Sequence, residues 1–396
     1  MLYRFADCEL DLRRYRFRRG GETVPLEPQV FDLLAPFLSR PGELIGRDEI
    51  IADIWGGRCV SDAAVSSRIN ALRRAVGDDG RAQTVLQTVP RRGFRLVAPV
   101  SVDDRGETAA PADEAEAQTI RMARSRDGTR IAHTTTGAGP PMLRAGHFLT
   151  HLELDWKSPV WRPFLDRLGS SFSVTRYDQR GTGLSDPSPP DLSLERLADD
   201  LEAVADAAGL DRFPILAASQ GVPVAVAFAA RCPERVSRLV LYGGYAQGRA
   251  VRGTEEEVRN AEAIQTVIRQ GWGRSGGAFA AAFATLYMPD ATRAQLEHMA
   301  QMQLASASVE IAVALRRAID AYDVTDILDR VKAPTLILHA REDSVHPASQ
   351  SGVLSAGIPD ARLHVMEGRN HVPLPQDPCW EELLGAAEAF LGRSGG

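Results

Sequence analysis

The hydrophobic pattern of the first hundred residues begins with a period of two and then takes on helical spacing. Apolar residues alternate with polar ones as far as Phe17, which predicts a small antiparallel sheet. Three segments with apolar residues three and four apart follow, and we expect helices that begin near Pro28, cover about 47–55, and follow Asp62. A sheet, three helices and a closing hairpin over 85–97 are typical of a winged helix.

Polar and basic residues lie off the apolar face of the third predicted helix and at the tip of the hairpin. In a winged helix this helix face enters the major groove of DNA, and a basic hairpin tip suits the neighbouring minor groove. Arginine and asparagine can read guanine and adenine edges or bind phosphate. Taken singly, each arginine is more often part of a solvated face. The candidate DNA-binding residues are Arg68, Asn70, Arg73 and Arg74 on the helix and Arg91 and Arg92 on the hairpin.

The net charge of −6 is unevenly distributed along the 396 residues. Residues 1–100 hold 16 arginines and no lysine against 13 acidic residues, whereas the rest of the chain holds 30 basic against 39 acidic residues. This asymmetry predicts that the N-terminal part tolerates a polyanion and that the C-terminal part does not.

Three sequence segments carry a resemblance to a known DNA-binding domain. They read LEPQVFDLLAPFLSRPGELIGRDEIIADIW, VSDAAVSSRINALRRAVGDD and QTVPRRGFRL. They resemble the first two helices, the recognition helix and the wing of the OmpR/PhoB-type DNA-binding domain. The resemblance covers nearly all of residues 1–98 and implies double-stranded DNA as a partner.

A change of composition separates this part from a second one. Residues 99–118 are acidic, rich in Ala and Pro and without apolar periodicity, which predicts a flexible linker. From Thr119 onward, apolar runs alternate with helical segments, as expected for a doubly wound, mostly parallel α/β sheet. The expected later strands are 142–145, 173–177, 236–242, 335–339 and 362–366.

Ser219 lies where an apolar run ends and an alanine-rich helical run begins. Small residues stand two positions before it (Ala217) and two after it (Gly221). A nucleophile elbow requires this arrangement, because its serine sits on a strained turn where bulky neighbours would clash. A serine that caps a buried helix is the simpler reading of this stretch alone.

Residues 119–393 as a whole resemble the α/β-hydrolase family. The stretch YDQRGTGLSD (177–186) is similar to the glycine-rich turn after the fourth strand of that fold, and we interpret it as structural. The predicted helical segment over about 245–326 lies where a lid would cover Ser219. The predicted fold class is therefore an N-terminal winged helix-turn-helix plus a C-terminal α/β-hydrolase fold with a helical lid.

The resemblance implies a catalytic triad in the chain order Ser, Asp, His. Asp343 in LILHAREDSVHP follows a strand at the position of the family's acid, and His371 in EGRNHVPL follows the last strand at the position of its histidine. Such a serine needs a base to take its proton and an acid to orient the base. Glu342 adjoins Asp343, and His339 and His346 are alternative bases. His339 lies inside an apolar strand and is expected to be a core residue.

The resemblance also implies an oxyanion hole and a ligand pocket. The first backbone donor is expected at Gln220 by its position after the nucleophile, and the second at Phe148, because His147-Phe148 stands in place of the family's His-Gly pair. Aromatic residues in such places are as often core residues as ligand contacts. The candidate pocket residues are His147, Phe148, His151, Trp156, Trp272 and Tyr287.

The fusion predicts a transcriptional regulator whose hydrolase domain senses a small apolar ester, lactone or amide. The sequence leaves open whether the domain also hydrolyses this ligand. The alternative is a serine carboxylic-ester hydrolase with an accessory DNA-binding domain. A third hypothesis, a catalytically silent dimerisation scaffold, does not explain a complete triad.

The remaining expectations concern location and partners. No run of about 18 apolar residues and no apolar leader occur, so we expect a cytoplasmic protein without a membrane partner. The four cysteines show no C-x-x-C spacing, and no metal or cofactor is expected. A homodimer is expected, because a single winged helix offers a small interface with DNA.

Overall fold

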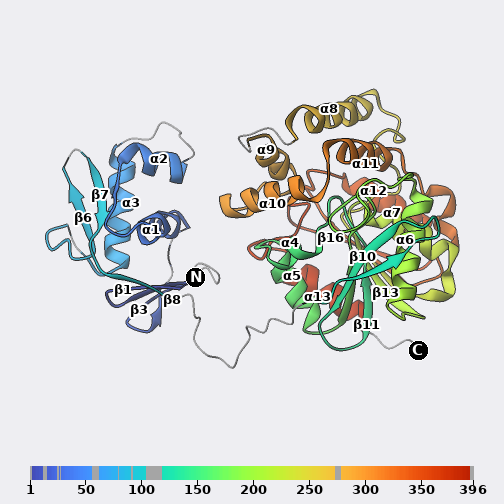
Figure 1. Ribbon diagram of the computed structural model, residues 1–396, viewed down its shortest axis with the longest axis horizontal. Coiled ribbons are helices and arrows are strands. Elements are labelled where there is room, and N and C mark those ends of the chain that lie inside the picture. The colour runs from blue at the N-terminus through green and yellow to red at the C-terminus, as the bar shows by residue number, and fades with distance from the viewer. Residues whose placement is uncertain are drawn as a thin grey trace. The chain divides into compact units, whose positions relative to one another are not determined.

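The computed structural model describes residues 2–11, 16–24, 26, 28–55, 62–78, 80–90, 92–103, 118–272 and 278–392 (Figure 1). The chain divides into two compact units, Met1–Ala115 and Glu116–Gly396. Among the described residues, none of the helices combines the length and the apolar character needed to cross a lipid bilayer.

The N-terminal unit packs two small sheets against three helices around one apolar core. The first sheet has the strand order β4-β3-β2-β1-β8 and the second the order β5-β7-β6. The helices are α1 (Pro28–Ser39), α2 (Arg47–Trp55) and α3 (Asp62–Ala75). The strands are β1 (Leu2–Phe5), β2 (Cys8–Asp11), β3 (Arg16–Arg19), β4 (Glu22–Thr23), β5 (Leu44–Ile45), β6 (Leu86–Val89), β7 (Gly93–Leu96) and β8 (Val100–Asp103).

The winged helix is confirmed by these elements. The apolar residues of α3 that show helical spacing, Val65, Ile69 and Leu72, are all buried in the core. Strands β6 and β7 pair as the antiparallel hairpin expected over 85–97.

The expected linker over 99–118 begins too early. Residues Val100–Asp103 form β8, which pairs antiparallel with β1 so that Val100 lies opposite Phe5 and packs on the core. Four residues are too few to show an alternation of apolar and polar positions next to an acidic segment. The strand is recognised only from its pairing with β1. The other end is also ordered, because the Gln118 side-chain amide donates to the Leu152 carbonyl at 2.9 Å.

The C-terminal unit is built on an eight-stranded sheet in the order β16-β15-β14-β13-β11-β12-β10-β9. Its strands pair in parallel from β16 to β12, whereas β10 pairs antiparallel with both β12 and β9. The strands are β9 (Arg121–Arg124), β10 (Arg130–Thr136), β11 (Pro141–Arg144), β12 (Ser173–Tyr177), β13 (Phe213–Ala218), β14 (Val236–Tyr242), β15 (Thr335–Ala340) and β16 (Ala361–Met366). The predicted doubly wound α/β sheet is confirmed.

Helices cover both faces of this sheet, as Figure 1 shows. Side chains alternate between the two faces along each strand. Leu143 and Ile215 pack with α6 and α7, whereas Met142 and Leu216 pack with α5 and α13. The helices are α4 (Leu152–Trp156), α5 (Trp161–Gly169), α6 (Leu194–Ala207), α7 (Gly221–Arg231), α12 (Ala348–Gly357) and α13 (Trp380–Leu391).

Between β14 and β15, the described part of the chain contains four α-helices, which we call the helical insert. They are α8 (Glu255–Gly271), α9 (Ala278–Tyr287), α10 (Arg293–Ser306) and α11 (Val309–Ala321). Their apolar side chains form a core cluster of their own with Phe148 and Trp161. The helical character expected for this segment is thus observed, and its role as a lid stays a prediction.

The turn after β12 is held by a buried ion cluster around Arg180. Its guanidinium is fully buried and donates to both carboxylate oxygens of Asp200 at 2.7 Å. It also donates to Asp127 at 2.8 Å, in the turn between β9 and β10. The guanidinium therefore ties three segments together, which supports the structural interpretation of the 177–186 stretch.

Replacing Arg180 with Met should destabilise the C-terminal unit strongly. The substitution leaves two carboxylates without their cation, and breaking a buried pair in this way costs about 3–5 kcal/mol. We expect a loss of this size in the free energy of unfolding, measured by urea titration. Arg259→Met is the matched control, because its exposed pair with Glu255 at 3.2 Å should add nothing measurable. Equal losses in the two variants would contradict a special role for Arg180.

Candidate functional site

Ser219 occupies a sharp turn between β13 and α7. Its φ is +52°, a left-handed conformation that is rare for any residue with a side chain. A hydrogen bond helps to hold this strained backbone conformation in place, since the Ser219 N–H donates to the Tyr242 carbonyl at 2.9 Å. A Cβ atom added to Gly221 would lie 2.7 Å from the Gly146 carbonyl oxygen. Glycine at this position therefore lets α7 begin directly against the loop after β11.

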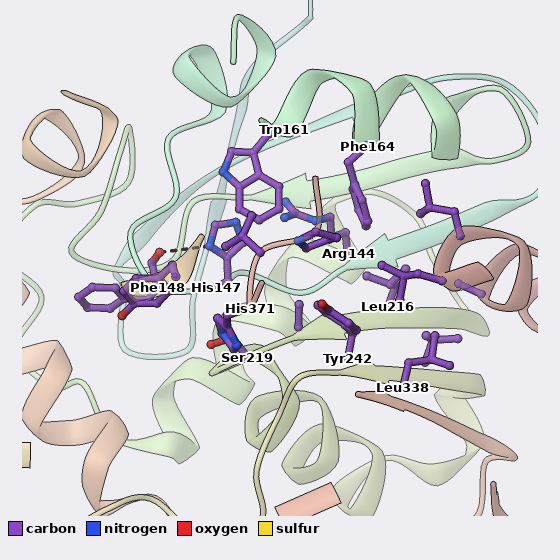
Figure 2. Close-up of a pocket in the computed structure, with 18 of the residues that line it drawn as sticks. Arg144, His147, Phe148, Trp161, Phe164, Leu216, Ser219, Tyr242, Leu338 and His371 are labelled. Atoms are coloured by element: carbon purple, nitrogen blue, oxygen red, sulfur yellow. Dashed lines mark hydrogen bonds between the residues drawn. The ribbon is translucent and has the colours of Figure 1, made fainter. Parts of the chain in front are cut away.

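His371 and Asp343 meet beside this turn. The His371 Nδ1 donates to Asp343 Oδ2 at 2.8 Å, while the backbone N–H groups of Val345 and His346 donate to Oδ1 at 2.7 and 3.0 Å. The buried Nε2 of His371 has no hydrogen-bond partner among the described residues. Figure 2 shows Ser219 next to His371, in front of the strands that carry Leu216 and Tyr242. The arrangement suits proton transfer from a serine hydroxyl to a histidine oriented by a carboxylate.

The electrostatics keep Asp343 ionised. Burial by itself raises the pKa of this carboxyl, but the positive charge of a protonated His371 and the three hydrogen bonds outweigh burial. The pKa of Asp343 therefore lies below its ordinary value, and the carboxylate can stabilise an imidazolium that forms during a reaction.

The structure also places the three alternative residues. His339 is buried and uses both ring nitrogens, with Ser351 Oγ at 2.7 Å and the His346 carbonyl at 3.0 Å. Burial lowers the pKa of His346 far below its ordinary value, so its ring is neutral. Glu342 is exposed to solvent. His339 Nε2 lies 3.8 Å from Asp343 Oδ2, beyond hydrogen-bond distance, so His371 at 2.8 Å is the histidine that bonds this carboxylate.

One pocket of the C-terminal unit contains Ser219 and His371. It extends from Ser219 between the sheet and the helices α5 and α13, and the helical insert contributes to its wall. Of the predicted pocket residues, Tyr287 lines it, as do His147 and Phe148, which Figure 2 labels. Sequence reasoning missed a larger set of lining residues, namely Arg144, Trp161, Phe164, Leu216, Ala218, Val240, Tyr242, Met299, Met302, Gln303, Leu338, Val372, Pro373 and, in α13, Leu383, Leu384 and Ala387.

Three predicted pocket residues, His151, Trp156 and Trp272, are not among those that line it. The Trp156 ring lies under the Arg162 guanidinium, whose central carbon is 4.0 Å from the ring centroid. Trp272 ends α8, donates from its indole N–H to the Ala307 carbonyl at 3.0 Å and lies against Phe283. His151 is the half-buried residue before α4. The two tryptophan rings thus pack locally against neighbouring helical residues.

His147 stands at the place of the expected oxyanion loop. Its ring stacks on Trp161 with centroids 4.5 Å apart, and its Nδ1 lies 3.1 Å from the Phe148 carbonyl. Burial lowers the pKa of His147 well below its ordinary value, with the Arg144 charge acting in the same direction. The neutral ring must donate from Nδ1 to the carbonyl, so its buried Nε2 is an acceptor. The oxyanion donors predicted at Gln220 and Phe148 stay a prediction.

The candidate DNA-binding residues divide into two groups in the structure. Asn70, Arg74 and Arg92 are exposed, and Arg68 is half-buried. Arg91 lies outside the described residues. Arg73 differs, because it is only 7% exposed and donates to the Leu86 carbonyl at 2.9 Å and to Thr88 Oγ1 at 2.8 Å. The expectation that Arg73 lies on the open face of the helix is therefore wrong, since its guanidinium joins α3 to β6 instead.

Comparisons with known proteins agree with this architecture. The chain belongs to the α/β-hydrolase fold family, whose model matches residues 149–378. The model described as transcriptional regulatory protein, C terminal, matches residues 21–96. The protein thus joins a winged-helix DNA-binding domain of the transcription-regulator type to an α/β-hydrolase domain.

Individual relatives match each part separately. The chain is 30% identical over 174 residues to the transcriptional activator CadC of Escherichia coli K12, an alignment that covers 42% of this chain and 32% of CadC. It thus spans about a third of that relative's length. It is 26% identical over 251 residues to the putative carbamate hydrolase RutD of Azorhizobium caulinodans, covering 63% of this chain and 91% of RutD. A solved hydrolase structure from Pseudomonas aeruginosa PA01 matches with a TM-score of 0.58 and 26% identity, over 70% of this chain and all of that one.

The two arginines at the end of α3 should respond differently to substitution by alanine. Arg73→Ala removes the hydrogen bonds to β6 and leaves buried acceptors unpaired, so we expect a loss of about 1–3 kcal/mol in the stability of the N-terminal unit. Arg74→Ala removes an exposed cation and should leave stability unchanged while weakening DNA binding. Chemical unfolding and fluorescence anisotropy with random-sequence duplex DNA measure the two effects. The assignment would be wrong if Arg74→Ala were the destabilising variant.

Proposed function

We propose that the protein is a transcriptional regulator that binds and slowly hydrolyses a small apolar ester, lactone or amide. The observation that carries the proposal is the placement of Ser219, at a left-handed φ, on an apolar pocket beside the His371–Asp343 pair. Such a strained, half-buried serine next to an imidazole nitrogen without a hydrogen-bond partner among the described residues suits acyl transfer. The similarity to RutD, which is described as a putative carbamate hydrolase, supports the same class of chemistry.

In the proposed reaction, the Ser219 hydroxyl attacks the carbonyl carbon of the ligand while His371 Nε2 takes its proton. The N–H groups of Gln220 and Phe148 stabilise the negative charge that develops on the carbonyl oxygen. His371 then protonates the leaving alcohol or amine, and Asp343 stabilises the imidazolium throughout. Water attacks the acyl-enzyme by the same route and restores Ser219.

The helical insert could couple ligand binding to a conformational change, because it contacts both the pocket and the loop that carries His371. The N–H groups of His371 and Val372 donate to the Tyr287 carbonyl at 2.9 and 3.2 Å, and Tyr287 is the last residue of α9. A ligand in the pocket touches the insert and the catalytic loop together. We infer that the insert acts as a lid and that its movement on ligand binding alters a homodimer and hence the affinity for DNA. We expect the protein to act in the cytoplasm, because a transcriptional regulator must reach the DNA there.

Ester hydrolysis should depend on Ser219. We expect the purified protein to release p-nitrophenol from a panel of p-nitrophenyl acyl esters, and Ser219→Ala to lower kcat/KM by at least about 10⁴-fold, because the nucleophile is lost. Ser170→Ala, which removes an exposed hydroxyl, is the matched control and should retain full activity.

The rate separates the two enzyme classes. A kcat of about 1–1000 per second on a member of the panel favours a dedicated hydrolase with an accessory DNA-binding domain. A much slower, Ser219-dependent reaction favours the sensor. Release that is equal in wild type and Ser219→Ala rules out Ser219 as the nucleophile.

Ligand binding should change the affinity for DNA. The Ser219→Ala variant keeps an ester intact, so we would add the best p-nitrophenyl ester of the panel and measure binding to duplexes selected from a random pool. Coupling between two sites is typically about 5- to 150-fold in affinity, and we expect a change in this range. Affinities that stay equal with and without every ester of the panel would contradict the regulatory role.

A further inference from the structure

A buried arginine lines the pocket that contains Ser219. Arg144 ends β11 on the same face of the sheet as Met142, toward α5. Its guanidinium carbon lies 4.8 Å from the centroid of the Trp161 ring and 5.5 Å from that of Phe164, while the side chain is 4% exposed (Figure 2). Its Nη2 is buried and has no hydrogen-bond partner in the described part of the chain. The pocket thus holds a cation with an unused donor.

A second buried arginine, Arg176, raises the electrostatic free-energy cost of burying Arg144. Arg176 of β12 is the direct neighbour of Arg144 in the parallel register, so both side chains project from the same face. Arg176 has polar partners, since it donates to the Gln118 side chain and, at 3.4 Å, to the Leu152 carbonyl. Arg144 forms no ion pair within 4.0 Å with a carboxylate of the described residues. Two adjacent buried guanidinium groups require negative charge nearby.

The carboxylates of the protein balance these charges only in part. Burial raises the pKa of Asp155 to about 6, against the opposing effect of both arginines, and burial raises the pKa of Asp178 to about 7. Burial lowers the pKa of Arg144 to about 10, so it stays charged at neutral pH. Asp155 is the carboxylate whose charge acts on both arginines, and its buried Oδ1 has no hydrogen-bond partner among the described residues. Its burial disfavours the ionised form, so it compensates the two guanidinium groups only in part.

The remaining lining shows what kind of ligand fits. Besides Arg144, the sheet side is formed by the apolar residues Leu216, Ala218, Val240 and Leu338 and by Tyr242, whose hydroxyl donates to the Asn370 carbonyl at 3.2 Å. Arg144 lies beside Leu216 in the register, and Ser219 follows Leu216 by three residues, or about 10 Å of extended chain. The pocket therefore offers a nucleophile and a buried cation separated by an apolar wall.

We propose that the ligand carries a carboxylate at the far end of its acyl part and that Arg144 binds this carboxylate. The inference rests on the proposed function and deepens it, because it places the scissile carbonyl at Ser219. It identifies the ligand as a half-ester or half-amide of an apolar dicarboxylic acid. A carboxylate accepts from the free guanidinium donor and supplies the missing charge. The rings of Trp161 and Phe164 keep the guanidinium in place for this contact.

The test measures equilibrium binding, so it does not depend on turnover. In the Ser219→Ala background, calorimetry compares the monomethyl esters of dicarboxylic acids from succinate to sebacate with the matching dimethyl esters. We expect at least one monoanionic half-ester to bind about 10- to 100-fold more tightly than its neutral diester, as for a hydrogen bond to a charged group in a buried site.

Three substitutions assign the preference to its residue. Arg144→Met should abolish the preference for the half-ester, and Arg144→Lys, which keeps the charge, should retain part of it. Arg162→Met is the matched control, because Arg162 follows Trp161 on α5 but is not among the pocket-lining residues. It should leave the preference intact. If Arg144→Met does not fold, the half-ester preference and its partial retention in Arg144→Lys still decide the proposal.

Three outcomes would overturn this inference and leave the proposed role of Ser219 unaffected. These are equal affinities for half-esters and diesters, an undiminished preference in Arg144→Met, or no binding of any half-ester. The p-nitrophenyl assay judges Ser219 independently. Binding of a half-ester without Ser219-dependent hydrolysis would leave the anionic subsite standing and remove only the enzymatic part of the proposed function.

Discussion

The C-terminal unit depends on the close approach of three backbone segments around Ser219. The turn from β13 to α7 is fixed by the hydrogen bond from Ser219 to Tyr242 at the end of β14, and α7 starts against the Gly146 carbonyl of the loop after β11. Adjacent parallel strands end at the same edge of the sheet, so their loops gather there. The left-handed φ of Ser219 is tolerable only because these neighbours hold the turn from both sides. The position of Ser219, the place of the loop that carries His147 and Phe148, and the pocket beside them all follow from this approach.

The pocket lies between the sheet and the helices α5 and α13, and the helical insert contributes to its wall. The sheet contributes the charged Arg144 to the lining, whereas the insert contributes uncharged side chains such as Met299 and Gln303. The insert also contacts the loop that carries His371, whose backbone N–H donates to the Tyr287 carbonyl. Selectivity for a ligand is therefore expected from the sheet, and the response to the ligand is expected from the helical insert.

Local patterns predicted most of the fold. The strands at 173–177 and 236–242 and the helix at about 47–55 were recovered with their bounds, because each shows a clear period and a clear stop. The strand Val100–Asp103 was missed, since its four residues acquire a reason to be extended only beside β1. Among the site residues, Ser219, Asp343 and His371 were predicted from order and context, and the structure brings the histidine and the aspartate within 2.8 Å. Trp156 and Trp272 were chosen for their aromatic rings, and packing uses them elsewhere.

The sequence by itself determined the two units, the strand-to-helix turn at Ser219 and the chain order of the three polar residues, because these depend on neighbours close along the chain. Only the tertiary structure decided where the arginines point. Arg73 and Arg74 are adjacent on one helix, yet one is buried against the wing and the other is exposed. Arg144 is a charged residue at the end of an apolar strand, and only the packing of α5 across that strand makes it part of the pocket. Burial and ion pairing are set by segments distant in the chain, so no local pattern contains them.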